Sequence, residues 1–207
     1  MLDHALARLF ALLSRLRHDR AVHGRGEAWH GRLQVASTTT RWGLALLDES
    51  ATYDVLVRRS RALGLPAWLP DVTGLAIRIP DAGGASRHQD LLLDTSGRSL
   101  LGRRIPTLHR SGGEHHYSSL LAWRAGGSNL LLGARDIWPG RLALFLARPT
   151  QRWQPWATLE LLDRMPQQAA DELHLSPGNT AGGLELGSWL QRLRPDSYRA
   201  SAEAAPD

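Results

Sequence analysis

Several segments of the chain alternate apolar and polar residues, as strands with one buried face do. The segment 53–56 alternates in this way, and Leu75, Ile77 and Ile79 place three apolar side chains on one face of a second segment. Short apolar runs follow at 117–123, 130–134, 141–147 and 158–161. Gly, Asn and Pro separate these runs, which is typical of antiparallel strands joined by turns. We therefore predict an antiparallel β-barrel, because closure of the sheet removes its exposed edges.

The beginning of the chain has a helical period instead. Apolar residues recur there at the spacing of one helix face: Leu2, Ala5, Leu6, Leu9, Phe10, Leu12, Leu13 and Leu16. Asp3, His4 and Arg8 interrupt the stretch, so we interpret it as neither a signal peptide nor a membrane span. We predict an amphipathic N-terminal helix over 1–19, a few C-terminal helices and a disordered tail over 200–207. The fold class is then α+β, in one domain over 1–207.

The amino-acid composition limits which classes of binding partner we expect. The formal net charge is +5, and every basic residue is arginine, which keeps its charge and forms paired bonds to carboxylate or phosphate. Neither a block of like charges nor a basic stripe with interleaved aromatics is present, so we expect no nucleic acid and no membrane as partner. The chain has no cysteine, so iron or another metal would need His, Tyr or carboxylate ligands. We expect a cytoplasmic protein.

The stretch 20–35 combines a histidine with closely spaced glycines. It contains Arg20 and His23, followed by Gly24, Gly26 and Gly31, before the apolar residues of a first strand at 33 and 35. Glycines allow unusual backbone angles and close approach of the backbone to a ligand, so we predict a turn here that presses His23 against a flat molecule. The spacing R-x-V-H-x-x-G-x-x-x-x-G-x-x-x-V resembles the distal-histidine segment of heme catalases.

Three further blocks resemble the same family in the same order. The block V-R-x-S-x-x-x-G at 57–64 is similar to the strand whose Arg holds a heme propionate and whose Ser accepts a hydrogen bond from the distal histidine; the resemblance gives these roles to Arg58 and Ser60. The block at 71–79 has Thr73 where the family has arginine. The block 90–96 has Asp94 where the family has an asparagine that faces the peroxide. The segment 97–113, which we predict as a loop, is much shorter than in the family.

The C-terminal part resembles the family where it supplies the axial ligand. Residues 173–185 are similar to the passage L-A-F-D-P-x-N-x-x-x-G-I-E, which precedes the ligand helix. Arg194 and Tyr198 then have the spacing of the family's R-x-x-x-Y motif. The resemblance implies that Tyr198 ligates iron as a phenolate and that Arg194 stabilises its charge. The residues 195–198 also resemble a different catalase passage, N-P-D-N-Y, and Pro195 suits a helix only in its first turn.

Taken together, the resemblance implies a heme-dependent catalase-like or peroxidase-like protein that acts on hydrogen peroxide or organic peroxides. His23 would move a proton between the peroxide oxygens, assisted by Ser60 and Asp94. Arg20 and Arg58 would pair with the propionates. Heme and a small peroxide are then the partners, and a homo-oligomer is possible. An alternative is a catalase-type barrel that has lost heme and serves as a binding or oligomeric scaffold, which the departures at Thr73 and Asp94 favour.

Two other histidine patterns suggest different chemistry. His18, Asp19, His23, His30 and Asp71 could form a metal-dependent phosphodiesterase site, but such sites need ligands on facing helices, and here turns and strands carry them. His115 and His116 are adjacent, so on a strand they would point to opposite faces and could not share one metal ion. We predict that this pair lies exposed on a hairpin.

Overall fold

The structure, a computed structural model, describes residues 26–38, 40–61, 68–109 and 114–187. The strands in these ranges are β1 (Gly26–Val35), β2 (Ala51–Arg61), β3 (Thr73–Ile79), β4 (Gln89–Thr95), β5 (His116–Ser118), β6 (Trp123–Ala125), β7 (Ser128–Trp138), β8 (Arg141–Ala147), β9 (Gln154–Arg164) and β10 (Glu185–Leu186). The helices are short: α2 (Ala45–Asp48), the 3-10 turn η1 (Gly102–Arg104) and α3 (Gln167–Glu172).

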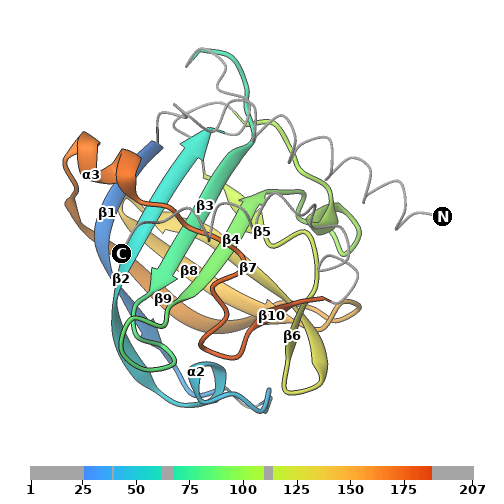
Figure 1. Cartoon of the computed structure of the whole chain (residues 1–207). Coiled ribbons are helices and arrows are strands. Elements are labelled where there is room, and N and C mark those ends of the chain that lie inside the picture. The colour runs from blue at the N-terminus through green and yellow to red at the C-terminus, as the bar shows by residue number, and fades with distance from the viewer. Residues whose placement is uncertain (1–25, 39, 62–67, 110–113, 188–207) are drawn as a thin grey trace, which may run out of the picture.

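Eight strands close into an antiparallel barrel. The order around it is β1-β2-β3-β4-β5-β7-β8-β9, and β9 pairs with β1 to complete the circle (Figure 1). Strands β6 and β10 extend β7 at one side, since β6 pairs with β7 and β10 pairs with β6. The predicted antiparallel barrel is therefore confirmed. The predicted N-terminal helix and the tail over 200–207 lie outside the described residues, and in the described part no helix has the length and apolarity needed to cross a bilayer.

Alternation along each strand fills the barrel with apolar side chains. Val55 and Val57 of β2, and Ile77 of β3, belong to one cluster of buried residues that draws on every barrel strand. A separate, smaller cluster lies outside the barrel, where Ala28 of β1 packs with Ala170 of α3. Residues that alternate with the inner set therefore face outward, which assigns each strand position to one of two faces.

The first strand begins earlier than predicted. Residues 26–31 belong to β1 and not to a turn, and at Gly26 and Gly31 the missing side chains let neighbouring groups approach the strand closely. A Cβ at Gly31 would lie 2.9 Å from the carbonyl oxygen of Glu160 on β9. One at Gly26 would lie 2.6 Å from Nε of Arg58. The register of β1 against β9 also shifts at this point, between Trp29 and Gly31. These two glycines therefore have a role in packing the sheet, whether or not a ligand binds beside them.

Two adjacent residues of β4 fasten the segment 174–184 to the barrel. Asp90 is fully buried and binds Arg78 through two contacts of 2.8 Å. The same carboxylate accepts hydrogen bonds from the backbone N–H of Ser176 at 2.7 Å and from the Asn179 amide at 2.8 Å. Gln89 both donates to and accepts from the backbone of Leu184. The conformation of this segment thus depends on polar contacts with β4.

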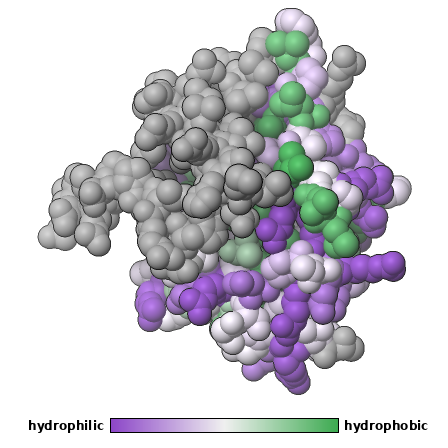
Figure 2. All heavy atoms as spheres, turned by 90° about the vertical axis from the view of Figure 1, so that its right-hand side faces the viewer, coloured by the Kyte–Doolittle hydropathy of each residue, from purple (hydrophilic) through white to green (hydrophobic). Residues whose placement is uncertain are grey.

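The loop around η1 carries an apolar surface. Leu100, Leu101, Ile105 and Leu108 are between 50% and 74% exposed. Figure 2 shows the molecule from this side, where apolar residues gather next to strongly polar ones. The prediction of a loop over 97–113 holds for its described part apart from η1, but the loop is more apolar at its surface than a solvated connection needs to be.

Candidate functional site

The outward faces of β1 to β5 carry a row of small and polar residues. Strand pairing aligns Gly26 with Ser60, Ser60 with Gly74, Gly74 with Asp94, and Asp94 with Ser118. Their neighbours along each strand point into the barrel core. Gly74 is buried and adds no side chain, and it separates Ser60 from Asp94 across two strand spacings, about 10 Å. We call these three positions the Gly74 strip.

Arg58 lies on the same outward face as Ser60, two residues earlier in β2. Its Nη1 donates to the carbonyl oxygen of Leu173, at the end of α3, at 3.3 Å. The space that Gly26 leaves beside β1 holds Nε of this guanidinium close to the sheet. Three of the site residues predicted from the sequence, Arg58, Ser60 and Asp94, therefore lie on one face.

Four other predicted site residues, Arg20, His23, Arg194 and Tyr198, lie outside the described residues. Their roles remain predictions.

The row continues into a stacked pair that the sequence analysis missed. Ser118 pairs with Gly133, where a Cβ would lie 2.9 to 3.1 Å from the ring of Trp153. The guanidinium of Arg103 lies over that ring, 4.7 Å from its centroid, and only 1% of this arginine is exposed. Arg103 also donates to the carbonyl oxygens of Arg148 and Pro149. An indole and a buried cation thus border the strip beyond Ser118, in a segment whose sequence gave no periodic signal.

The tyrosines bear on which residue could ligate an iron. The chain has three, and Tyr53 and Tyr117 are the two in the described ranges. Tyr117 is buried in the barrel core, and Tyr53 packs against that core near the other end of β2. Both positions alternate with the outward residues, so neither phenol faces the strip. The glycine strip and the neighbouring arginine suit a flat group with carboxylates, so the described residues fit heme.

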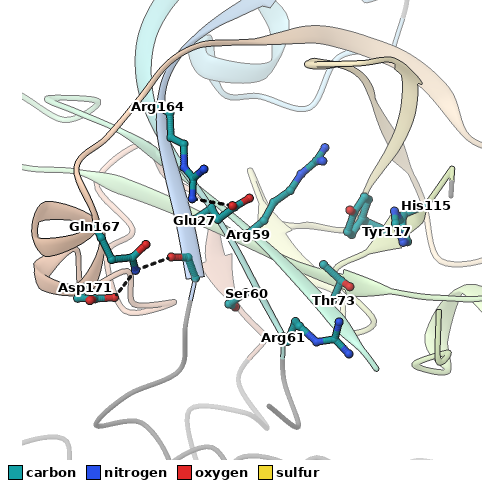
Figure 3. Close-up of a pocket in the computed structure, with 11 residues that line it drawn as sticks. Glu27, Arg59, Ser60, Arg61, Thr73, His115, Tyr117, Arg164, Gln167 and Asp171 are labelled. Atoms are coloured by element: carbon teal, nitrogen blue, oxygen red, sulfur yellow. Dashed lines mark hydrogen bonds and ion pairs between the residues drawn. The ribbon is translucent and has the colours of Figure 1, made fainter. Parts of the chain in front are cut away.

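A second polar cluster lies inside the mouth of the barrel. A pocket of about 620 Å³ is lined by inward side chains that include Arg59, Arg61, Thr73, His115 and Tyr117 (Figure 3). At its rim Glu27 pairs with Arg164 at 2.7 Å. Ser60 also borders the pocket, so the inner cluster and the outer strip meet at the end of β2.

Asp136 organises this inner cluster from behind the pocket wall. Arg59 donates to one of its oxygens at 2.5 Å, and the backbone N–H of His115 donates to the other at 3.2 Å. The His115 ring nitrogen Nδ1 lies 3.3 Å from the same second oxygen. Burial opposes ionisation of Asp136, but hydrogen bonds from His115 and the charge of Arg59 outweigh it and hold the pKa of this carboxyl below its ordinary value.

The structure corrects the predictions about histidine pairs. His115 is buried, with 8% of its surface exposed, so the predicted exposed hairpin pair is wrong. Contact with Asp136, distant in sequence, draws its ring inside. Three ligands of the phosphodiesterase hypothesis, His18, Asp19 and His23, lie outside the described residues, and in the described ranges no three His, Asp or Glu side chains gather around a common point. Of its proposed ligands, His30 is exposed, whereas Asp71 is buried and paired with Arg61 at 3.4 Å.

The chain resembles known proteins in its structure, and not in its sequence. No family model matches the chain, and no curated protein matches its sequence. A bacterial catalase superposes with a TM-score of 0.54 at 13% identity, over 86% of this chain and 56% of that one. Catalase A from Saccharomyces cerevisiae gives a TM-score of 0.60 at 11% identity, over 94% of this chain and 64% of that one. The chain therefore spans less than two thirds of either catalase, and its fold is catalase-like.

Proposed function

We propose that the outer face of β1 to β4 is the distal wall of a heme site and that the protein turns over hydrogen peroxide or organic peroxides. The observation that carries this proposal is the strip over Gly74 between Ser60 and Asp94, with Arg58 on the same face. The catalase-like fold supports it. Bound heme would supply the redox chemistry, and the protein would position the peroxide and move its proton.

His23 is the residue we assign to proton transfer. It lies three residues before Gly26, and three residues of chain span at most about 10 Å. Gly26 pairs directly with Ser60, so the imidazole can reach the strip. The imidazole would donate to the Ser60 hydroxyl through one nitrogen and exchange a proton with peroxide through the other. Ser60 is then a positioning residue that fixes the ring.

The remaining assignments concern charge. Arg58 and Arg20 would pair with the two propionates, which gives bidentate, charge-assisted hydrogen bonds. Tyr198 would ligate the iron, and Arg194 would stabilise its phenolate form.

This proposal predicts that purified protein takes up hemin. After reconstitution and gel filtration, about one heme per chain should elute with the protein and show a Soret band. Replacing Tyr198 by Phe should remove the tyrosinate features of the spectrum, because Phe lacks the ligating oxygen. The matched control is Tyr53→Phe, which makes the same change inside the barrel and should leave the spectrum as it was. Pigment that elutes apart from the protein would favour a heme-free scaffold instead.

Because Asp94 stands where the resembling family has asparagine, we expect the natural chain to turn over peroxide slowly. A neutral asparagine can donate an N–H to bound peroxide, whereas an ionised carboxylate only accepts and places negative charge beside an oxygen that gains electron density. Asp94→Asn should therefore raise the rate of peroxide disproportionation at neutral pH by roughly tenfold or more, the scale of a single lost or gained donor at such a site.

The measurement is oxygen release per bound heme, with heme content matched between proteins. Asp54→Asn removes the same charge from β2 at a side chain that is 91% exposed, and it should change nothing. Equal or lower turnover in heme-loaded Asp94→Asn would mean that Asp94 does not face the peroxide.

A further inference from the structure

The inner wall of the barrel-mouth pocket has polar atoms that need a partner. Among the described residues, three buried atoms lining or bordering it have no hydrogen-bond partner: the Tyr117 hydroxyl, Nε of Arg59 and Nε2 of His115. Tyr117 is 2% exposed. Leaving one such group unsatisfied in the interior costs about 1–3 kcal/mol, so a water or a ligand has to satisfy these three.

These groups are held in fixed positions. Asp136 binds Arg59 and His115 at the same time, which leaves their other nitrogens for a third molecule. The rings of His115 and Tyr117 lie side by side, with centroids 5.9 Å apart (Figure 3). Neither Asp136 nor Asp71 lines the pocket, although each holds an arginine that does. Arg59 and Arg61 therefore face the pocket with their neutralising carboxylates behind them, and the two carboxylates that line its rim, Glu27 and Asp171, are bound to Arg164 and Gln167.

We infer that the barrel mouth is a second binding site, for a small molecule that carries a carboxylate. Arg59 is a permanent donor, and burial raises the pKa of Tyr117, so its hydroxyl keeps its proton and donates as well. A carboxylate accepts from both with its two oxygens. The pocket, at about 620 Å³, has the size of sites for small organic ligands.

The geometry also accounts for specificity against uncharged ligands. The contact between Nδ1 of His115 and Asp136 places a proton on Nδ1. A carboxylate offers two oxygens to the donors of Arg59 and Tyr117, whereas an alcohol has one oxygen to offer them. Thr73 is short and lines the pocket, so it leaves room for the rest of the ligand.

The test is a titration of the full chain with succinate, benzoate and glycerol, followed by calorimetry and by NMR of the labelled protein. We expect succinate or benzoate to bind and glycerol not to bind. Tyr117→Phe should weaken carboxylate binding about tenfold to a hundredfold, the effect of one lost hydrogen bond to a charged group. The variant should fold at least as well as the natural chain, because it removes a buried hydroxyl that lacks a partner.

Tyr53→Phe is the matched control, since it removes a hydroxyl from the far end of β2 and should leave binding unchanged. Absence of carboxylate binding, equal binding of glycerol, or equal affinity in Tyr117→Phe and Tyr53→Phe would each overturn the inference. The titration is run with and without hemin. Arg59 and Tyr117 point into the barrel, whereas Arg58 and Asp94 of the proposed heme wall face outward, so a chain that takes up no heme still tests the pocket.

Discussion

Replacing Asp90 by alanine should destabilise the protein by about 3–5 kcal/mol, the cost of removing one partner of a buried ion pair. Asp90 is fully buried, and its two oxygens meet Arg78, the Ser176 N–H and the Asn179 amide. The substitution leaves Arg78, which is 15% exposed, with the carbonyl oxygen of His174 as a hydrogen-bond partner but without its carboxylate. The guanidinium without its carboxylate and the loss of two hydrogen bonds to the segment 174–184 both lower the free energy of unfolding.

Urea denaturation followed by tryptophan fluorescence measures this effect. Asp90→Asn should cost less, because an amide can still accept from Ser176 although it loses the charge. Asp54→Ala is the control: its nearest cation, Arg32, is 4.0 Å away and both side chains are exposed, so stability should barely change. If Asp90→Ala were as mild as Asp54→Ala, the contacts of β4 would not hold the segment in place.

Asp90 also explains part of the resemblance in sequence. It opens the block 90–96, and Asn179 belongs to the block 173–185, two of the blocks that look like catalases. In the structure the Asn179 amide donates to the Asp90 carboxylate. The likeness of these two positions therefore reflects how the barrel is held together, whereas under the proposed function the likeness at Arg58 and Ser60 would concern the chemistry.

Alternation predicted the barrel well where turns mark the strand ends. The predicted run 141–147 is β8 with the same bounds, because Gly140 and Pro149 stop the pattern on both sides. The start of β1 was missed, since Gly26 and Gly31 look like turn residues in a sequence. Only the paired strands show that Arg58 and Glu160 occupy the space their side chains would need.

The inner cluster could not be predicted from the sequence. Arg58 and Arg59 are adjacent arginines, and alternation alone sends one outward and one inward without saying which has a partner. Arg59 binds Asp136, which is 77 residues away in the sequence, because closure of the barrel brings β2 and β7 together. The same closure buries His115. Sequence motifs describe local spacing, so a cluster built from β2, β5 and β7 leaves no motif to find.

His23→Gln should lower peroxide turnover of heme-loaded protein by about 10²–10⁴-fold, the usual contribution of a positioned proton-transfer group. Glutamine keeps a polar side chain but cannot take up and return a proton at neutral pH. Heme content should stay the same, because the proposed ligand is Tyr198 and the proposed propionate partners are arginines. The rate is measured as initial peroxide loss per bound heme. His30→Gln makes the same change at an exposed site of β1 and should leave the rate unaltered.

Ser60 allows the role of His23 to be separated from a general effect on the fold. If Ser60 acts by holding the imidazole, Ser60→Ala should lower turnover less than His23→Gln does, and the double variant should be no slower than His23→Gln alone. Independent contributions would instead multiply. A rate that is unchanged in His23→Gln, or a double variant slower than either single one by the product of their effects, would place proton transfer elsewhere than over the Gly74 strip.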